Sequence, residues 1–166
     1  MQNLVVQRVL GAARFDRESF LWMLWNDRAG GDAAILVLIT QAALTLGLVG
    51  LDFGLALQLF ISGLFFWLIY SGLTYAAAKY LFDGSGQFGG VMRIAGFAFP
   101  TTILVLAFRF LVGDARVAYL LSLVWFVAIV AHGLKEAMDL PMDKGWMSAG
   151  AGVLGFLVVS SVLGGI

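Results

Sequence analysis

The sequence predicts an all-α membrane protein, a bundle of five transmembrane helices preceded by an amphipathic interfacial N-terminal helix. Of its 166 residues, 61% are hydrophobic and 12% are charged, and that charged share is about half of what a soluble domain uses. Five long stretches carry no charge at all, and about 20 apolar residues suffice to cross a bilayer as a helix. Their apolar residues are continuous rather than alternating, which favours helices over the strands of a barrel.

The interfacial segment is expected in residues 1–32. Apolar residues recur at helical spacing from Val5 to Ala13. A bulky apolar run that includes Trp22 and Trp25 follows, and we expect these two tryptophans to anchor the helix among the lipid headgroups. The rival interpretation is a docking surface for the tail of a partner protein. Residues 30–32, Gly-Gly-Asp, are expected to break the helix before the first span.

The membrane domain is expected in residues 33–166, with spans at about 33–51, 54–79, 91–112, 116–134 and 147–166. A tight turn at residues 50–54 would make the first two spans a hairpin, held by interhelical hydrogen bonds from Gln41, Thr45, Gln58 and Ser62. The third span is short between Arg93 and Arg109, whose long side chains can extend to the headgroups.

A glycine-rich loop separates the second and third spans. Its glycines are Gly84, Gly86, Gly89 and Gly90. A phosphate-binding dinucleotide fingerprint would need a preceding strand and a later acidic residue; neither is predicted, so we interpret the loop as a structural turn. Within the third span, Pro100 removes a backbone hydrogen bond and frees the carbonyl of Gly96. The resulting kink serves either the architecture or the hinge of a gate.

The last span is rich in small residues that let helix backbones approach closely. Ser148 and Gly152 form one pair at a spacing of four, and Ala151 and Gly155 form another. The sequence leaves open whether these residues pack within the chain or against a second copy.

The distribution of cations predicts the orientation in the membrane. Eight of the ten lysines and arginines fall on the side of the N-terminal segment and the second and fourth loops, and two fall on the other side. Because cytoplasmic loops are enriched in these residues, we expect the N-terminus in the cytoplasm and the C-terminus, Ile166, across the membrane. The membrane would be the cell membrane if the source is prokaryotic.

Residues 80–100 read YLFDGSGQFGGVMRIAGFAFP. This stretch resembles the signature of the Yip domain family, in which a glycine-rich cytoplasmic loop leads into a span with a Gly-Tyr-x-x-Pro-like element; Phe97 stands in place of the tyrosine. The stretch from Trp125 to the short polar loop after His132 is similar as well. The resemblance implies five helices with the termini on opposite sides.

Members of that family were first known as partners of Rab-type GTPases. The trafficking members carry a long cytoplasmic N-terminal region with an Asp-Leu-Tyr-Gly-Pro element, which residues 1–32 lack. The chain is therefore similar to the short members, and the resemblance leaves open whether it binds a GTPase.

No catalytic, cofactor or metal site is predicted. His132 is the single histidine, and pairing it with Ser122 or Ser148 would still leave a triad without a carboxylate at membrane depth. Glu136 would give it only one further metal ligand. We therefore expect a protein that is not an enzyme and has no cofactor.

Two functions fit this sequence. The first is a non-catalytic scaffold, trafficking or assembly factor, or accessory subunit of a membrane complex. The second is a permease or channel for a small neutral or lipidic solute. The expected partners are the bilayer and other integral membrane proteins or further copies of the chain. Nucleic acid is excluded, because ten acidic residues balance the ten basic ones.

Overall fold

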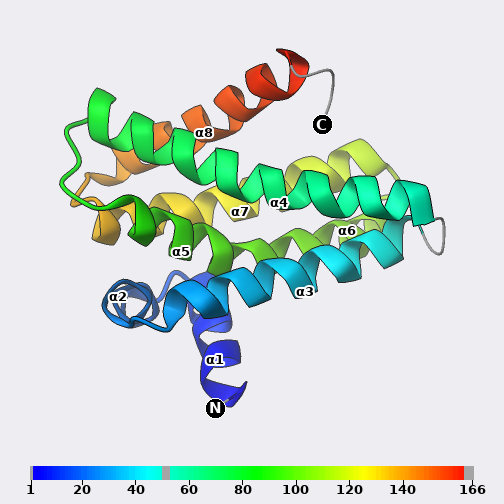
Figure 1. Ribbon diagram of the computed structural model, residues 1–166, viewed down its shortest axis with the longest axis horizontal. Coiled ribbons are helices and arrows are strands. Elements are labelled where there is room, and N and C mark those ends of the chain that lie inside the picture. Colours follow the sequence, from blue (N-terminus) through cyan, green and yellow to red (C-terminus); the bar gives the residue numbers. More distant parts are fainter. Residues whose placement is uncertain (1, 50–52, 163–166) are drawn as a thin grey trace.

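A computed structural model describes residues 2–49 and 53–162, and almost all of them are helical (Figure 1). The predicted turn at residues 50–52 and the C-terminal Ile166 lie outside the described residues. The elements in chain order are α1 (Gln2–Ala13), α2 (Arg17–Trp25), α3 (Ala29–Val49), α4 (Phe53–Ala76), the π-helical turn η1 (Ala77–Leu81), α5 (Phe88–Ala98), the 3-10 turn η2 (Phe99–Ile103), α6 (Leu104–Val112), α7 (Ala115–Ala137) and α8 (Met142–Val162).

Five helical stretches are long and apolar enough to cross a membrane, which confirms the predicted fold class. They are Ala29–Leu48, Phe53–Leu81, Phe88–Val112, Ala115–Ala137 and Met142–Val162. Many large apolar side chains on their outer surfaces are exposed, among them Phe53, Phe110 and Val162. Water would disfavour so much exposed apolar surface; a bilayer solvates it. The protein is therefore an integral membrane protein whose spans contact lipid.

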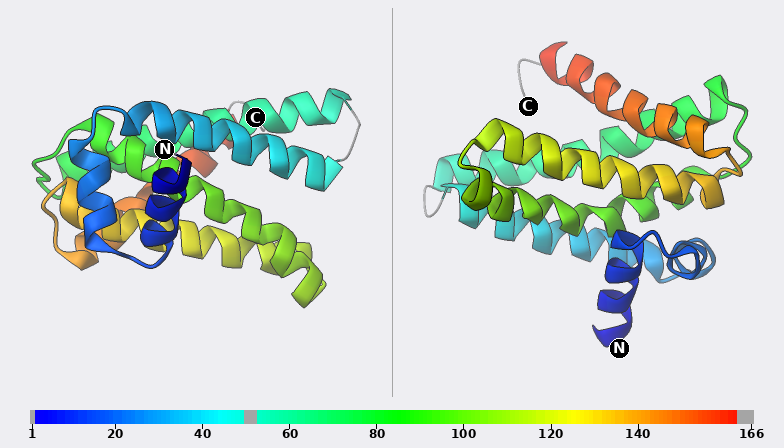
Figure 2. Two further views of the ribbon diagram at one scale, coloured as in Figure 1. Left: turned by 90° about the horizontal axis from the view of Figure 1, so that it is seen from below. Right: turned by 180° about the vertical axis from the view of Figure 1, so that it is seen from behind.

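The spans run side by side and alternate in direction, so the bundle has two distinct ends (Figures 1 and 2). We call the end formed by α2, residues 82–87 and residues 138–141 the cap end, and the opposite end the far end. α1 projects sideways from the bundle, roughly across the spans, and α8 diverges from its neighbours towards the far end (Figure 2).

The core is concentrated in the half of the bundle next to the cap end. Among the described residues, the largest side chains that are almost fully buried include Phe20, Met23, Phe97 and Leu134, which belong to this half. A second, smaller cluster around Leu44, Val105 and Ala118 lies in the far half. The two halves therefore differ in packing: the cap half is densely packed, and the far half is packed more loosely.

The N-terminal segment contains two helices rather than one continuous interfacial helix. α1 ends at Ala13, and Phe15 takes a left-handed conformation with φ 61°. Asp16 then starts α2, because its carboxylate accepts hydrogen bonds from the backbone of Glu18 and Ser19 at 3.4 and 3.1 Å. Such N-caps satisfy orphan amides at the start of a helix.

The expected helix break at Gly30, Gly31 and Asp32 is wrong, because α3 begins at Ala29 and includes all three residues. Glycine is tolerated there because first-turn amides make no hydrogen bond within the helix, and Asp32 favours a helix N-terminus. The fourth loop is also shorter than expected. α7 continues through Lys135 and Glu136 to Ala137, so only residues 138–141 connect it to α8.

The third span does change direction at its proline, through the 3-10 turn η2 (Figure 1). The carbonyl of Gly96 accepts a hydrogen bond from the backbone of Phe99. The hydroxyls of Thr101 and Thr102 donate to the carbonyls of Ala98 and Phe99, each at 2.7 Å. The threonines thus stabilise the turn by bonding carbonyls other than the one that the proline was expected to free.

Candidate functional site

A set of hydrogen bonds and aromatic contacts joins α2 to the third span. Arg93 of α5 donates from Nη1 to the carbonyls of Met23 and Leu24 at 3.3 and 3.0 Å. The last carbonyls of a helix have no partner within it and carry partial negative charge, so a guanidinium stabilises them. Phe20 and Met23 of α2 are buried in the core. Arg93 therefore binds α2 to the bundle, whereas the sequence suggested that its side chain extends to the headgroups.

The start of α2 is held by an ion pair. Arg17 Nε lies 3.0 Å from Glu136 Oε2 at the end of α7. The pKa of the nearby Asp16 carboxyl is lowered, first by the hydrogen bond that the hydroxyl of Ser19 donates to it at 2.7 Å, with further contributions from the backbone amides of Glu18 and Ser19 and from the charge of Arg8. α2 is thus fixed at both of its ends.

Aromatic contacts complete the region formed by α2, residues 82–87 and residues 138–141, which we call the cap. Trp22 meets Phe97 edge to face at 5.9 Å between ring centroids, and the guanidinium of Arg8 lies 5.6 Å from the Trp22 ring. The rings of Phe15 and His132 lie 4.2 Å apart between centroids and are tilted by 31°. The two predicted anchors therefore differ, because Trp22 packs against the bundle while Trp25 is 83% exposed.

The motif loop supports the cap from the other side. The amide of Gly84 donates to the carbonyl of Ala78 at 2.9 Å, and the amide of Ser85 donates to the carbonyl of Met138 at 3.0 Å, so the loop joins η1 to the end of α7. A Cβ at Gly86 would collide with the carbonyl of Ala137. The same atom at Gly90 would lie 3.0 Å from Leu24, and at Gly89 it would meet nothing.

Gly96 and Phe97 of the motif lie inside the bundle rather than at its surface. A Cβ at Gly96 would lie 2.6 Å from the Cβ of Ala33, so the glycine lets α5 approach α3 closely. Phe97 is fully buried. Pro100 is half-buried in η2. These motif residues shape the packing of the cap half.

The small residues of α8 face α4 of the same chain. A Cβ at Gly152 would collide with the hydroxyl of Thr74, and one at Gly155 would lie 2.9 Å from Leu73. Ser148 is fully buried. Ala151 is half-buried. This close approach within the chain uses Gly152 and Gly155, which leaves no need for a second copy to explain them.

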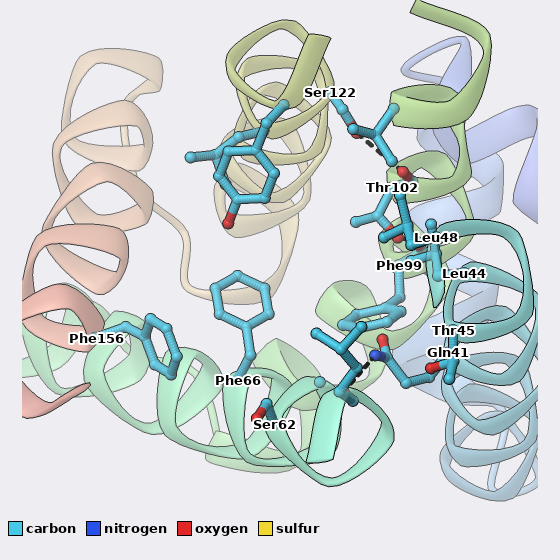
Figure 3. A pocket seen from close by; sticks show the side chains of 15 residues that line it. Gln41, Leu44, Thr45, Leu48, Ser62, Phe66, Phe99, Thr102, Ser122 and Phe156 are labelled. Atoms are coloured by element: carbon cyan, nitrogen blue, oxygen red, sulfur yellow. Dashed lines mark hydrogen bonds between the residues drawn. The ribbon is translucent and has the colours of Figure 1, made fainter. Parts of the chain in front are cut away.

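The far half contains a cavity of about 280 Å³ between α3, α4, η2, α6, α7 and α8 (Figure 3). Its polar lining residues are Gln41, Thr45, Ser62, Thr102, Tyr119 and Ser122, and no charged residue contributes to its wall. Gln41 donates to the carbonyl of Leu59 at 2.7 Å, which is one of the expected bonds of the first hairpin. Ser62 donates instead to Gln58 of its own helix.

Comparison with family models assigns residues 8–164 to the Yip1 domain. The chain belongs to the Yip1 domain family. The match extends over the cap, the motif loop and all five spans of this Yip1 domain. Comparison with curated proteins gives no match, and comparison with solved structures gives none either.

The described part of the Yip1 domain brings no catalytic set together. His132 Nδ1 lies 2.8 Å from the carbonyl of Ala128, and Ser122 donates to the carbonyls of Thr101 and Thr102. Ser148 is buried without a hydrogen-bond partner among the described residues. No cluster of three or more potential metal ligands occurs within residues 2–49 and 53–162.

Sequence reasoning missed the residues that build the cap. The sequence suggested that Arg93 extends to the headgroups and that Glu136 could at most add one metal ligand to His132, and it predicted no contact for Arg17. Their partners lie 69, 119 and 119 positions away, and no local pattern marks pairs at such separations. The motif itself was the available signal, because its glycines and Phe97 lie where the cap contacts the bundle.

Proposed function

We propose that this Yip1 domain protein is a non-catalytic scaffold that contacts other membrane proteins through its cap, with the cap on the cytoplasmic side. The observation that carries the proposal is where the motif residues lie. Gly84, Gly86 and Gly90 support the loop and α2, and Phe97 contacts Trp22. None of them lines the cavity, and of residues 80–100 only Phe99 does. The family signature therefore specifies the shape of one end of the bundle.

A protein-binding role for the cap also fits its surface. α2 is fixed in place by Arg93 and Glu136, so it loses little conformational entropy when a partner binds. Trp25 remains 83% exposed on this fixed helix, and tryptophan is a frequent anchor of protein interfaces. The cap therefore combines a rigid framework with an accessible aromatic side chain.

The packing of the cap half argues against the permease. The cavity is lined mainly by residues of the far half, together with Phe66 and Phe99 of the main core, and the cap half is filled by fully buried side chains such as Phe97 and Ile129. Interiors packed at this density leave few voids as large as a water molecule. The described residues of the cap half therefore leave less room for a solute than those of the far half do.

The orientation follows from the cations. Arg17, Arg28, Lys79 and Lys135 are exposed at or near the cap end, whereas the far end has Arg109 and Arg116. The excess at the cap end supports placing it in the cytoplasm.

Site-specific photocrosslinking in native membranes tests the scaffold. A photoreactive amino acid at Trp25 should give a discrete adduct with a membrane protein that remains stoichiometric after purification in mild detergent. The same group at Phe110, which is 91% exposed at the far end, serves as the control and should give mainly lipid adducts. A chain recovered only as a monomer, with no adduct at Trp25 and with flux of a neutral solute in proteoliposomes, would favour the permease.

A further inference from the structure

The cavity in the far half has the properties of a ligand site that the scaffold role does not use. Its volume of about 280 Å³ corresponds to roughly nine groups that each occupy ~30 Å³, the volume of a water molecule. Leu48 and Tyr119 of its wall are exposed at the surface of the bundle. Leu48 is the last residue of the span Ala29–Leu48 and Tyr119 is close to the start of the span Ala115–Ala137, so this edge of the cavity faces the bilayer near the far end of the bundle.

The hydrogen bonds that the lining side chains already make restrict the chemistry of the ligand further. The hydroxyls of Ser62, Thr102 and Ser122 already donate to backbone carbonyls. The hydroxyl of Thr45, in a residue 5% exposed, has no partner among the described residues. A buried polar group in this state is unfavourable until something bonds it.

Gln41 supplies the complementary atom. Its Nε2 donates to Leu59, and no donor from the described residues is found at its Oε1. Gln41 and Thr45 are four positions apart on α3, so they lie on the same face of the helix. Figure 3 shows both side chains on the α3 wall, with Phe66 and Phe156 across the space. The α3 side of the wall thus offers one free donor and one free acceptor side by side, and Tyr119 of α7 adds a further hydroxyl to the lining.

A hydroxyl is the simplest group that accepts from Thr45 and donates to Gln41 at once. The lining holds no charged side chain, and burying an unpaired charge here would be costly. We propose that the cavity binds an uncharged single-chain lipid alcohol, with its hydroxyl between Gln41 and Thr45 and its first methylene groups along Phe66. This inference is independent of the scaffold role.

Photoaffinity labelling of the full chain in phosphatidylcholine vesicles tests the proposal. The probes are hexadecanol and hexadecanoic acid, each carrying the same diazirine and alkyne on the chain. The alcohol should label peptides of α3, α4 and α7, and unlabelled hexadecanol should compete. Equal labelling by the acid, or labelling confined to peptides outside the cavity, would overturn the proposal, because the site would then be a generic apolar contact for acyl chains.

Thr45→Val provides the matched test of the hydroxyl. It preserves the shape of the side chain, and we expect labelling to fall about three- to tenfold, the effect of one lost hydrogen bond. Thr40→Val makes the same change at a buried position of α3 outside the lining and should leave labelling unchanged. Equal labelling of all three proteins would contradict the proposal.

A competition experiment on the unaltered chain tests the second hydrogen bond without a variant. Hexadecyl methyl ether can accept from Thr45 but cannot donate to Gln41. It should therefore compete several-fold less well than hexadecanol. Equal competition by the two molecules would show that Gln41 accepts no ligand proton, and it would overturn the proposed position of the hydroxyl.

Discussion

A glycine in a membrane helix either makes room for a neighbouring helix or leaves open space beside it, and this chain has both kinds. A Cβ at Gly96 would lie 2.6 Å from the Cβ and 3.2 Å from the Cα of Ala33, whereas a Cβ at Gly72 of α4 would meet nothing within 4 Å. The backbone of α3 cannot yield as a flexible side-chain end can. Alanine substitutions at Gly96 and Gly72 therefore distinguish the effect of helix propensity from the effect of helix packing.

We expect Gly96→Ala to lower the stability of the protein and Gly72→Ala to maintain or raise it. Alanine improves helix propensity by about 1 kcal/mol at either site, but overpacking at Gly96 costs about 1–3 kcal/mol. Thermal unfolding in detergent, followed by size-exclusion chromatography, measures both. By the same argument, Gly96→Leu should lower the yield of folded protein more than Pro100→Ala. Equal melting temperatures for the two alanine variants would contradict the close approach of α5 to α3.

Of the two arginines that hold α2, Arg93 contributes more than Arg17. Its guanidinium bonds two carbonyls of α2 in a half-buried site, and hydrogen bonds to charged groups contribute about 1.5–3 kcal/mol. Arg17 is 73% exposed in its pair with Glu136, and pairs of that kind contribute at most about 1 kcal/mol.

Arg93→Met should therefore release the end of α2. We expect the amides of its last turn to exchange with deuterium about tenfold faster or more, because local opening loses the energy of these bonds. Arg17→Met should change the same exchange much less. Arg28→Met, an exposed cation beyond α2, is the control that should have no effect. Exchange rates that are unchanged in Arg93→Met would show that the arginine does not hold α2.

At the scale of elements, the packing of α8 on α4 depends on Gly152. A Cβ there would collide with the hydroxyl of Thr74 and lie 3.0 Å from the ring of Tyr70, whereas one at Gly150 would meet nothing within 4 Å. Small residues on one face of α8 thus belong to a contact within the chain, and the other face remains open to lipid or to a partner.

Gly152→Val should lower the melting temperature of the isolated protein, and Gly150→Val should not. The comparison also separates two explanations of the small residues. If they served contact between copies, Gly152→Val would shift a dimer to a monomer in size-exclusion chromatography with light scattering, without destabilising the monomer. If they pack α8 on α4, the monomer itself should lose stability.

At the scale of the whole molecule, the spans could be predicted because their signal is local. Each long apolar stretch must be helical in lipid, where the backbone has to bond to itself, and composition alone reveals such stretches. Helix ends were predicted less well. The break expected at Gly30 and Gly31 was wrong, because a glycine in the first turn interrupts no hydrogen bond within the helix.

The cap could not be predicted in the same way. Its contacts join α2 to α5 and α7 through Arg93, Glu136 and Phe97, and these residues are far from their partners in the chain. The unpaired hydroxyl of Thr45 could not be predicted either, because the sequence suggested that it bonds across the first two spans. Whether that hydroxyl has a partner depends on the relative rotation of packed helices, which a hydrophobic pattern does not determine.

Cysteine mapping tests the five-span arrangement most directly, because the chain has no native cysteine to interfere. Single cysteines would replace Ser85 and Asp139 at the cap end and Arg116 at the far end, all exposed. In intact cells an impermeant maleimide should label Arg116→Cys alone, and the other two should react only after the membrane is opened. Labelling of all three from the same side, or reactivity of the cap-end cysteines in intact cells, would contradict the account.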